Sequence, residues 1–168
     1  MKYYAGIGSR QTPESLREKI HRISLFLKSK DYILRSGGAP GADTMFEEKI
    51  EVTHKEIFLP WKGFNNNNSN VFNVDNEALY LAEKFHPNWN ALSQGAQKLM
   101  ARNCYQVLGK NLKTPVDFII CYTKDGKSSG GTGQALRIAR LHKIKVFNLF
   151  NDVENEIFNF CTIPKKLF

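Results

Sequence analysis

Apolar runs alternate with amphipathic segments along most of the chain. The runs are short, as in buried strands, and we place them at 3–7, 32–34, 56–60, 116–122 and 145–149. Between them apolar residues recur at helical spacing, and we expect helices over 13–30, 43–52, 75–85, 91–109 and 130–142, with a short last one after Asp152. Strands that alternate with helices pair in parallel through right-handed crossovers. The pattern therefore predicts an α/β, Rossmann-like parallel sheet of about five strands with flanking helices, ordered 3-2-1-4-5.

Three polar residues stand where helices are expected to begin. Thr12 precedes Pro13 and Glu14, an arrangement typical of an N-cap followed by proline in the first turn. Asp152 is expected to cap the last helix in the same way. Asp43, at the start of the second helix, has two interpretations: it caps that helix, or it holds a ribose hydroxyl.

Residues 61–98 interrupt the alternation of strands and helices. Four consecutive asparagines neither build a core nor favour a helix, so we expect a surface loop there. The segment also carries Trp61, Phe64 and the sequence His86–Trp89. These aromatic residues are candidates to stack on a base or to form a lid, although core packing is the commoner use of aromatic side chains. We treat 61–98 as an insertion into a single domain that spans residues 1–168.

Length and composition place the chain among ordinary globular domains. It has 168 residues, of which 42% are hydrophobic and 24% charged. No apolar run approaches the roughly 20 residues of a membrane span, and the first residues lack the apolar core of a signal peptide. The three cysteines are scattered without a CxxC pair, which argues against a disulfide framework or a zinc site. We expect a cytoplasmic protein with no metal and no membrane partner.

The balance of charge points to an anionic partner. Lysine and arginine number 24 against 16 aspartates and glutamates, a formal net charge of +8. The basic residues are spread along the chain, however, and the densest local group is only Lys165–Lys166. An arm that binds nucleic acid usually shows a block of like charge. A small polyanion therefore fits the charge at least as well as DNA does.

Three predicted strands end in glycine-rich turns that lead into helices. The turns are Gly6–Arg10, Ser36–Asp43 and Ser129–Gly133. Glycine lets a ligand approach the main chain, and the N–H groups at a helix start favour an anion. In an open parallel sheet such turns converge outside the carboxyl ends of the strands, where ligands bind. We therefore predict a phosphate-binding site built by the three turns together.

The common nucleotide motifs are absent from these turns. No GxxxxGK[ST] sequence occurs, and the first turn is not a complete GxGxxG. No acidic residue is well placed to bind a ribose as in dinucleotide enzymes. We expect no redox role for a nicotinamide and no other cofactor.

At its glycine turns the sequence resembles the SLOG superfamily of Rossmann-like nucleotide-binding proteins. That superfamily includes Lonely Guy phosphoribohydrolases, DNA-processing protein A and the nucleotide-sensing domains of some bacterial immune proteins. The first turn is similar to its GSR motif, the second to its SGGAxGAD motif and the third to its GGxGT loop. The resemblance covers about 1–60 and 99–150, and it implies a nucleotide-derived ligand such as an ADP-ribose-like signal.

Two further segments bear on the resemblance to the phosphoribohydrolases of that superfamily, one through a similarity and one through a difference. Arg102 is similar to an arginine that serves their active site, with Asn103 in place of the lysine that follows it. We expect Arg102 to grip a phosphate and to contribute little to the core. The hydrolases also carry a glutamate after the glycine loop that takes part in N-glycosidic cleavage. Leu136 and Arg137 stand in that region here, so the usual carboxylate for hydrolysis is missing.

We therefore expect a protein that binds a phosphate-containing nucleotide derivative without hydrolysing it, as a sensor, carrier or sequestering protein. One alternative is a nucleotide N-glycoside hydrolase or transferase with another carboxylate, such as Glu14, Asp43 or Asp125. The other is a binder of single-stranded DNA. A homo-oligomer is one expectation for the assembly. The expected ligand-binding residues are Gly8, Ser9, Arg10, Ser36, Gly37, Gly38, Gly41, Asp43, Arg102, Asn103, Gly130, Gly131, Thr132 and Gly133.

Overall fold

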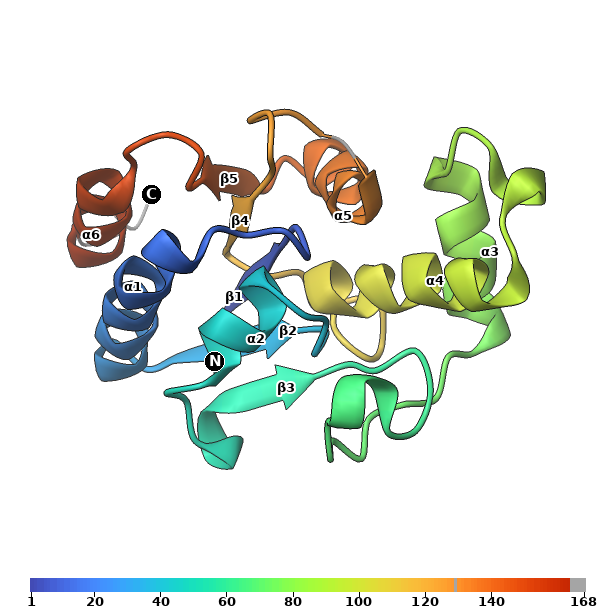
Figure 1. Cartoon of the computed structure of the whole chain (residues 1–168), viewed down its shortest axis with the longest axis horizontal. Coiled ribbons are helices and arrows are strands. Elements are labelled where there is room, and N and C mark those ends of the chain that lie inside the picture. Colours follow the sequence, from blue (N-terminus) through green and yellow to red (C-terminus); the bar gives the residue numbers. More distant parts are fainter. Residues whose placement is uncertain (129, 164–168) are drawn as a thin grey trace.

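Five parallel strands form one sheet, and their order confirms the expected topology (Figure 1). The computed structural model describes residues 1–128 and 130–163, so Ser129 of the third turn and Lys165–Lys166 lie outside the described residues. The strands are β1 (Lys2–Gly8), β2 (Tyr32–Ser36), β3 (Lys55–Ile57), β4 (Phe118–Tyr122) and β5 (Lys145–Asn148). They lie in the order β3-β2-β1-β4-β5, which puts β1 at the centre.

Helices connect the strands and cover both faces of the sheet. They are α1 (Arg17–Ser29), α2 (Ala42–Glu47), α3 (Asn76–Phe85), α4 (Gln94–Leu108), α5 (Gly130–Leu141) and α6 (Glu154–Thr162). The helices α1, α2 and α6 pack on one face, α4 and α5 pack on the other, and α3 packs against α4 and α5 (Figure 1). No helix in the described part of the chain is both long and apolar enough to span a membrane.

The pleat of each strand sends alternate side chains to the two faces. Tyr4 and Phe118 join the core beneath α1 and α2, and their rings stack with centroids 6.0 Å apart. Ile7 and Cys121 belong to the other core, beneath α4 and α5. The central strands are thus buried on both sides, as the continuous apolar runs predicted.

The starts and ends of several helices differ from the expected ones. The predicted N-cap at Thr12 is wrong, because its hydroxyl donates to the Ser9 carbonyl at 2.6 Å and α1 begins only at Arg17. Asp152 does not cap α6 either, since its carboxylate pairs with Lys19 Nζ at 3.2 Å. The helix α2 ends at Glu47 rather than near 52, because β3 begins at Lys55 and the chain must turn back to reach it.

The asparagine-rich loop is docked onto the sheet edge. Val71 forms an isolated parallel bridge with Phe58, and Asn65 Nδ2 donates to the carbonyl of Gly38 at 2.9 Å. Asn65 and Asn66 both have a left-handed backbone, with φ of 50° and 55°. Asparagine tolerates that conformation better than most residues, which explains why it is used here.

Candidate functional site

A cleft of about 330 Å³ opens where the carboxyl ends of β1 and β4 meet. From β1 the sheet runs to β2 and β3 on one side and to β4 and β5 on the other, so this is the topological switch point where ligands of such sheets bind. The described residues that line the cleft are Ile7, Gly8, Ser9, Arg10, Ala39, Asp43, Leu99, Met100, Arg102, Asn103, Gln106, Thr123, Lys124, Gly130, Gly131, Thr132 and Ala135.

The first and second glycine turns are joined to each other through the backbone. The Ser9 carbonyl accepts from the N–H of Ala42 at 3.2 Å. Gly41 lies directly behind this bond with φ at +83°, and a Cβ there would stand 2.4 Å from the Ser9 carbonyl oxygen. Only glycine combines that conformation with so close an approach. This contact fixes the position of the two turns relative to each other. Gly41 therefore shapes the cleft, although it does not line it.

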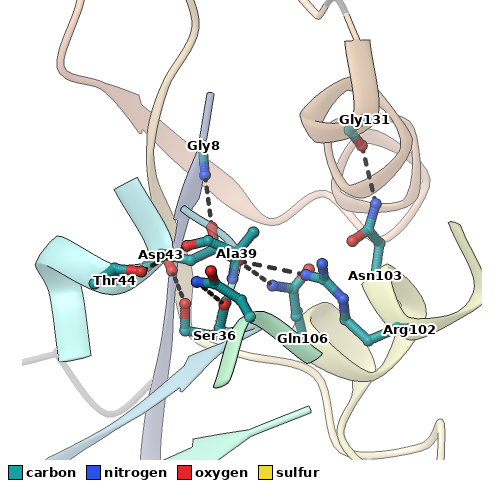
Figure 2. A network of polar contacts seen from close by, with 12 residues as sticks. Gly8, Ser36, Ala39, Asp43, Thr44, Arg102, Asn103, Gln106 and Gly131 are labelled. Carbon is teal, nitrogen blue, oxygen red and sulfur yellow. Dashed lines mark hydrogen bonds and ion pairs between the residues drawn. The ribbon is translucent and has the colours of Figure 1, made fainter. Parts of the chain in front are cut away.

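Asp43 connects the same two turns with its side chain (Figure 2). Its Oδ1 accepts from the N–H of Gly8 at 3.2 Å, and its Oδ2 accepts from the N–H of Ala39 at 3.4 Å. The same Oδ2 receives Arg102 Nη1 at 3.4 Å and Gln106 Nε2 at 3.5 Å, both from α4. The carboxylate is only 2% exposed and is surrounded by donors. The N-cap of α2 is Gly41, so the interpretation of Asp43 as a cap is wrong.

Arg102 forms the floor of the cleft and is almost completely buried, at 4% exposure. Its guanidinium lies 5.9 Å from the centroid of the Phe64 ring, and its Nε has no hydrogen-bond partner among the described residues. The guanidinium occupies the space that a side chain at Gly37 would fill, since a Cβ there would lie 1.6 Å from Nη1. Arg102 is therefore part of the packed interior as well as of the cleft, contrary to the expectation that it contributes little to the core.

The charges of Asp43 and Arg102 stabilise each other against burial. Burial raises the pKa of the Asp43 carboxyl, and the positive charge of Arg102 and the backbone N–H groups oppose the shift. Burial likewise lowers the pKa of the Arg102 guanidinium, which Asp43 opposes and the charge of nearby Arg10 reinforces. Removing either partner would leave the other as an uncompensated buried charge.

The other cations of the cleft are more accessible. Arg10 follows β1 and Lys124 follows β4. Both side chains are exposed, and both line the cleft. Among the described lining residues Asp43 is the one carboxylate, and it is committed to Arg102. The cleft is therefore positive at its mouth.

The start of α5 forms one wall of the cleft. Gly130, Gly131 and Thr132 line it, and the first turn of a helix presents N–H groups that have no partner within the helix. Asn103 Nδ2 donates to the Gly131 carbonyl at 2.9 Å and so holds α4 and α5 together (Figure 2). The positive end of the α5 dipole thus faces the same space as the cations.

The structure brings most of the predicted site residues together, but not all of them. Five of them do not line the cleft and lie behind or beside it: Ser36, Gly37, Gly38, Gly41 and Gly133. Ser36 donates its hydroxyl to the Gly6 carbonyl at 2.6 Å, which fixes the second turn against β1. Gly133 packs against the Ser128 carbonyl, where a Cβ would be 2.5 Å away.

Sequence reasoning missed several lining residues. Gln106 follows Arg102 by four positions, so helical spacing alone puts the two on one face of α4. Thr123 and Lys124 follow β4 directly, at the edge where ligands bind. Leu99 and Met100 form an apolar wall that no motif indicated.

The aromatic residues that were candidates to cover a base lie outside the cleft. Phe64 is buried beneath Arg102, and Trp61 packs edge-on against it with ring centroids 5.2 Å apart. His86 and Trp89 contact each other with centroids 6.3 Å apart, also away from the cleft lining. A base in the cleft would contact the aliphatic side chains of Leu99 and Met100 instead.

The region that corresponds to the hydrolases' glutamate serves the packing of α3 here. Leu136 is buried, and Arg137 Nε donates to the Phe85 carbonyl at 2.8 Å. Gln134 Nε2 donates to the Ala82 carbonyl, also at 2.8 Å. This face of α5 therefore binds the last carbonyls of α3 rather than facing the cleft.

The other candidate carboxylates do not line the cleft. Glu14 is bound to Arg17, and an oxygen of Asp125 accepts from the N–H of Lys127 at 2.9 Å. Within the described residues no cluster of histidine, cysteine, aspartate and glutamate could hold a metal ion.

Comparison with known proteins shows a likeness of structure only. No family model matches this sequence, and no curated protein matches it. Among solved structures, it is similar to DNA processing protein A from Helicobacter pylori, which binds single-stranded DNA. The two are 13% identical, the match covers 95% of this chain and 80% of that one, and the TM-score is 0.44. At that score the likeness carries no argument about the ligand or the mechanism.

Proposed function

We propose that this chain binds the phosphate group of a nucleotide or nucleotide derivative in the cleft without hydrolysing it. An ADP-ribose-like molecule belongs to this ligand class. The observation that carries the proposal is the meeting of Arg10, Lys124 and the first turn of α5 at one opening. Oriented N–H groups together with cations are the usual chemistry of phosphate recognition. Such a protein would act as a sensor, a carrier or a sequestering protein.

Each part of the cleft has a distinct role in this proposal. The phosphate lies against Gly130, Gly131 and Thr132, where N–H groups and a hydroxyl donate to its oxygens. Arg10 and Lys124 neutralise its charge from the mouth of the cleft. The base or sugar lies along the Leu99–Met100 wall. A volume of about 330 Å³ is at the small end for ligand sites, which favours a mononucleotide-sized group.

Two features argue against hydrolysis of an N-glycosidic bond. The lining carboxylate, Asp43, already accepts four hydrogen bonds from Gly8, Ala39, Arg102 and Gln106. An anion held in that way is poorly placed to take a proton from water or to stabilise an oxocarbenium ion. The second feature is the absence of the glutamate that hydrolases carry after the glycine loop. No carboxylate other than Asp43 is among the described residues that line the cleft.

The first experiment identifies the ligand directly. The protein is purified, heated to release bound small molecules, and the supernatant is analysed by mass spectrometry. We expect a phosphorylated nucleotide derivative, recovered intact. In parallel, the protein is incubated with nucleoside monophosphates and free base is followed by chromatography. Release of base that depends on Asp43 would replace the binding proposal with the hydrolase alternative.

A further inference from the structure

A second groove, of about 380 Å³, is lined by an exposed tryptophan and two lysines. Its lining includes Trp61, Lys62, Phe72 and Lys98. Trp61 is 41% exposed although its ring is held in place. One edge meets Phe64 at an interplanar angle of 88°, and the ring also lies beside α4, 3.9 Å from the position of a Cβ at Gly95. The indole is thus a fixed, accessible aromatic surface.

The charge of this groove favours an anion. Lys62 and Lys98 are both exposed, and no carboxylate is among the described residues that line the groove. The helix α4 begins nearby at Gln94 with no acidic residue in its first turn, so the positive end of its dipole is not neutralised there. A flat aromatic surface flanked by cations is the combination that binds a nucleobase together with its phosphate.

The helix α4 contributes lining residues to both the groove and the cleft. Gly95 and Arg102 are seven residues apart, which puts them on the same side of the helix about 10 Å from each other. Trp61 packs beside Gly95, and Phe64 packs beneath the guanidinium of Arg102. The aromatic pair therefore lies along this side of α4. Lys98 lines the groove and the next residue, Leu99, lines the cleft.

We propose that the Trp61 groove is a nucleobase subsite, which takes a second base joined through phosphate to the group in the cleft. The ligand class is therefore a dinucleotide, either as a free molecule or as part of a short single strand. The inference rests on the proposed function, because the cleft supplies the first point of attachment. It gives the inserted segment 61–98 a direct part in ligand binding.

The test uses tryptophan fluorescence in a Trp89→Phe background, which leaves Trp61 as the single tryptophan. The probes are AMP, the dinucleotide pApA and a long oligoadenylate. We expect pApA to quench Trp61 and AMP to bind without quenching it. In calorimetric titrations, Trp61→Leu should weaken pApA binding about 5- to 150-fold, the range for loss of one stacked base, and leave AMP within twofold. Lys98→Gln should weaken pApA selectively, while Lys49→Gln, outside both sites, should not.

Trp61→Phe keeps an aromatic ring and should retain most of the pApA affinity, which separates stacking from a disturbed fold; circular dichroism checks each variant. The proposal is overturned if pApA does not quench Trp61, or if Trp61→Leu weakens AMP and pApA equally. If AMP fails to bind, the cleft proposal falls, whereas Lys98-dependent quenching by pApA would still support the groove. Much tighter, steeply salt-dependent binding of the oligoadenylate would identify the dinucleotide as part of a strand.

Discussion

Replacement of Arg102 by methionine tests whether the pair it forms with Asp43 is as buried as the structure indicates. Methionine keeps an unbranched stem but removes the charge, so Asp43 loses its counter-ion while it stays enclosed. Breaking a buried ion pair by removing one partner typically costs about 3–5 kcal/mol. For a chain of this size that corresponds to a fall of about 6–20 °C in the melting temperature. Urea and thermal unfolding, followed by circular dichroism, measure both quantities.

The dependence of this loss on pH identifies the group responsible. Burial raises the pKa of Asp43 above its value in the unfolded chain, about 3.9. Between these two pKa values the folded state holds a proton that the unfolded state has lost, so stability falls as the pH rises through that window. Without the charge of Arg102 the pKa of Asp43 in the folded state rises further, so the pH range in which stability falls extends to higher pH. The variant should therefore approach the wild type in stability as the pH is lowered toward 4.

Two variants control the experiment. Arg22→Met removes an exposed arginine that pairs with Glu154 at 3.1 Å, and it should change the melting temperature little. The double variant Asp43→Asn with Arg102→Met should recover part of the loss, since no uncompensated charge remains. A loss below about 1 kcal/mol in Arg102→Met, equal at every pH, would place the pair in the range of surface ion pairs and refute the reasoning.

Three further substitutions and one titration examine other parts of the account. Gly37→Ala places a Cβ 1.6 Å from the Arg102 guanidinium, so we expect lower thermal stability and weaker ligand binding together. Gly131→Ala meets nothing closer than 3.6 Å and should leave the melting temperature unchanged or higher, while calorimetry shows weaker binding of a nucleoside monophosphate. Arg137→Met removes hydrogen bonds to Phe85 and Gln134, at a cost of about 1–2 kcal/mol, and amide exchange in α3 should accelerate. Binding of oligonucleotides should stay weak at physiological salt; submicromolar, length-dependent affinity there would favour the DNA alternative.

The order of the sheet was predictable because every strand is a short apolar run, and all but β3 are followed by a turn and an amphipathic helix. The chain direction and the handedness of the crossovers then leave few arrangements. Helix starts were less predictable, since the side chains that suggested caps had stronger partners elsewhere. Thr12 binds the carbonyl of Ser9, and Asp152 binds Lys19, which lies 133 residues away.

The candidate site was predictable where one turn or one helix carries several of its residues. The glycine turns were found for that reason, whereas Arg102 was found through its resemblance to the phosphoribohydrolase arginine. Residues of all three turns and Arg102 line the cleft at the end of β1. The pairing of Arg102 with Asp43 was not predictable, because 59 residues separate the two and no local pattern relates them. The position of Trp61 beside Gly95 likewise depends on how the docked loop crosses α4.

The central claim is that the cleft recognises phosphate, and a matched pair of calorimetric titrations tests it most directly. AMP and adenosine are titrated into the wild type and into the double variant Arg10→Gln with Lys124→Gln. We predict that the wild type binds AMP measurably and binds adenosine at least tenfold more weakly. The double variant should lose that difference. A tenfold difference corresponds to about 1.4 kcal/mol, and one hydrogen bond to a charged group supplies about that much. Equal affinity of the wild type for AMP and adenosine, or an unchanged preference for AMP in the double variant, would contradict the account.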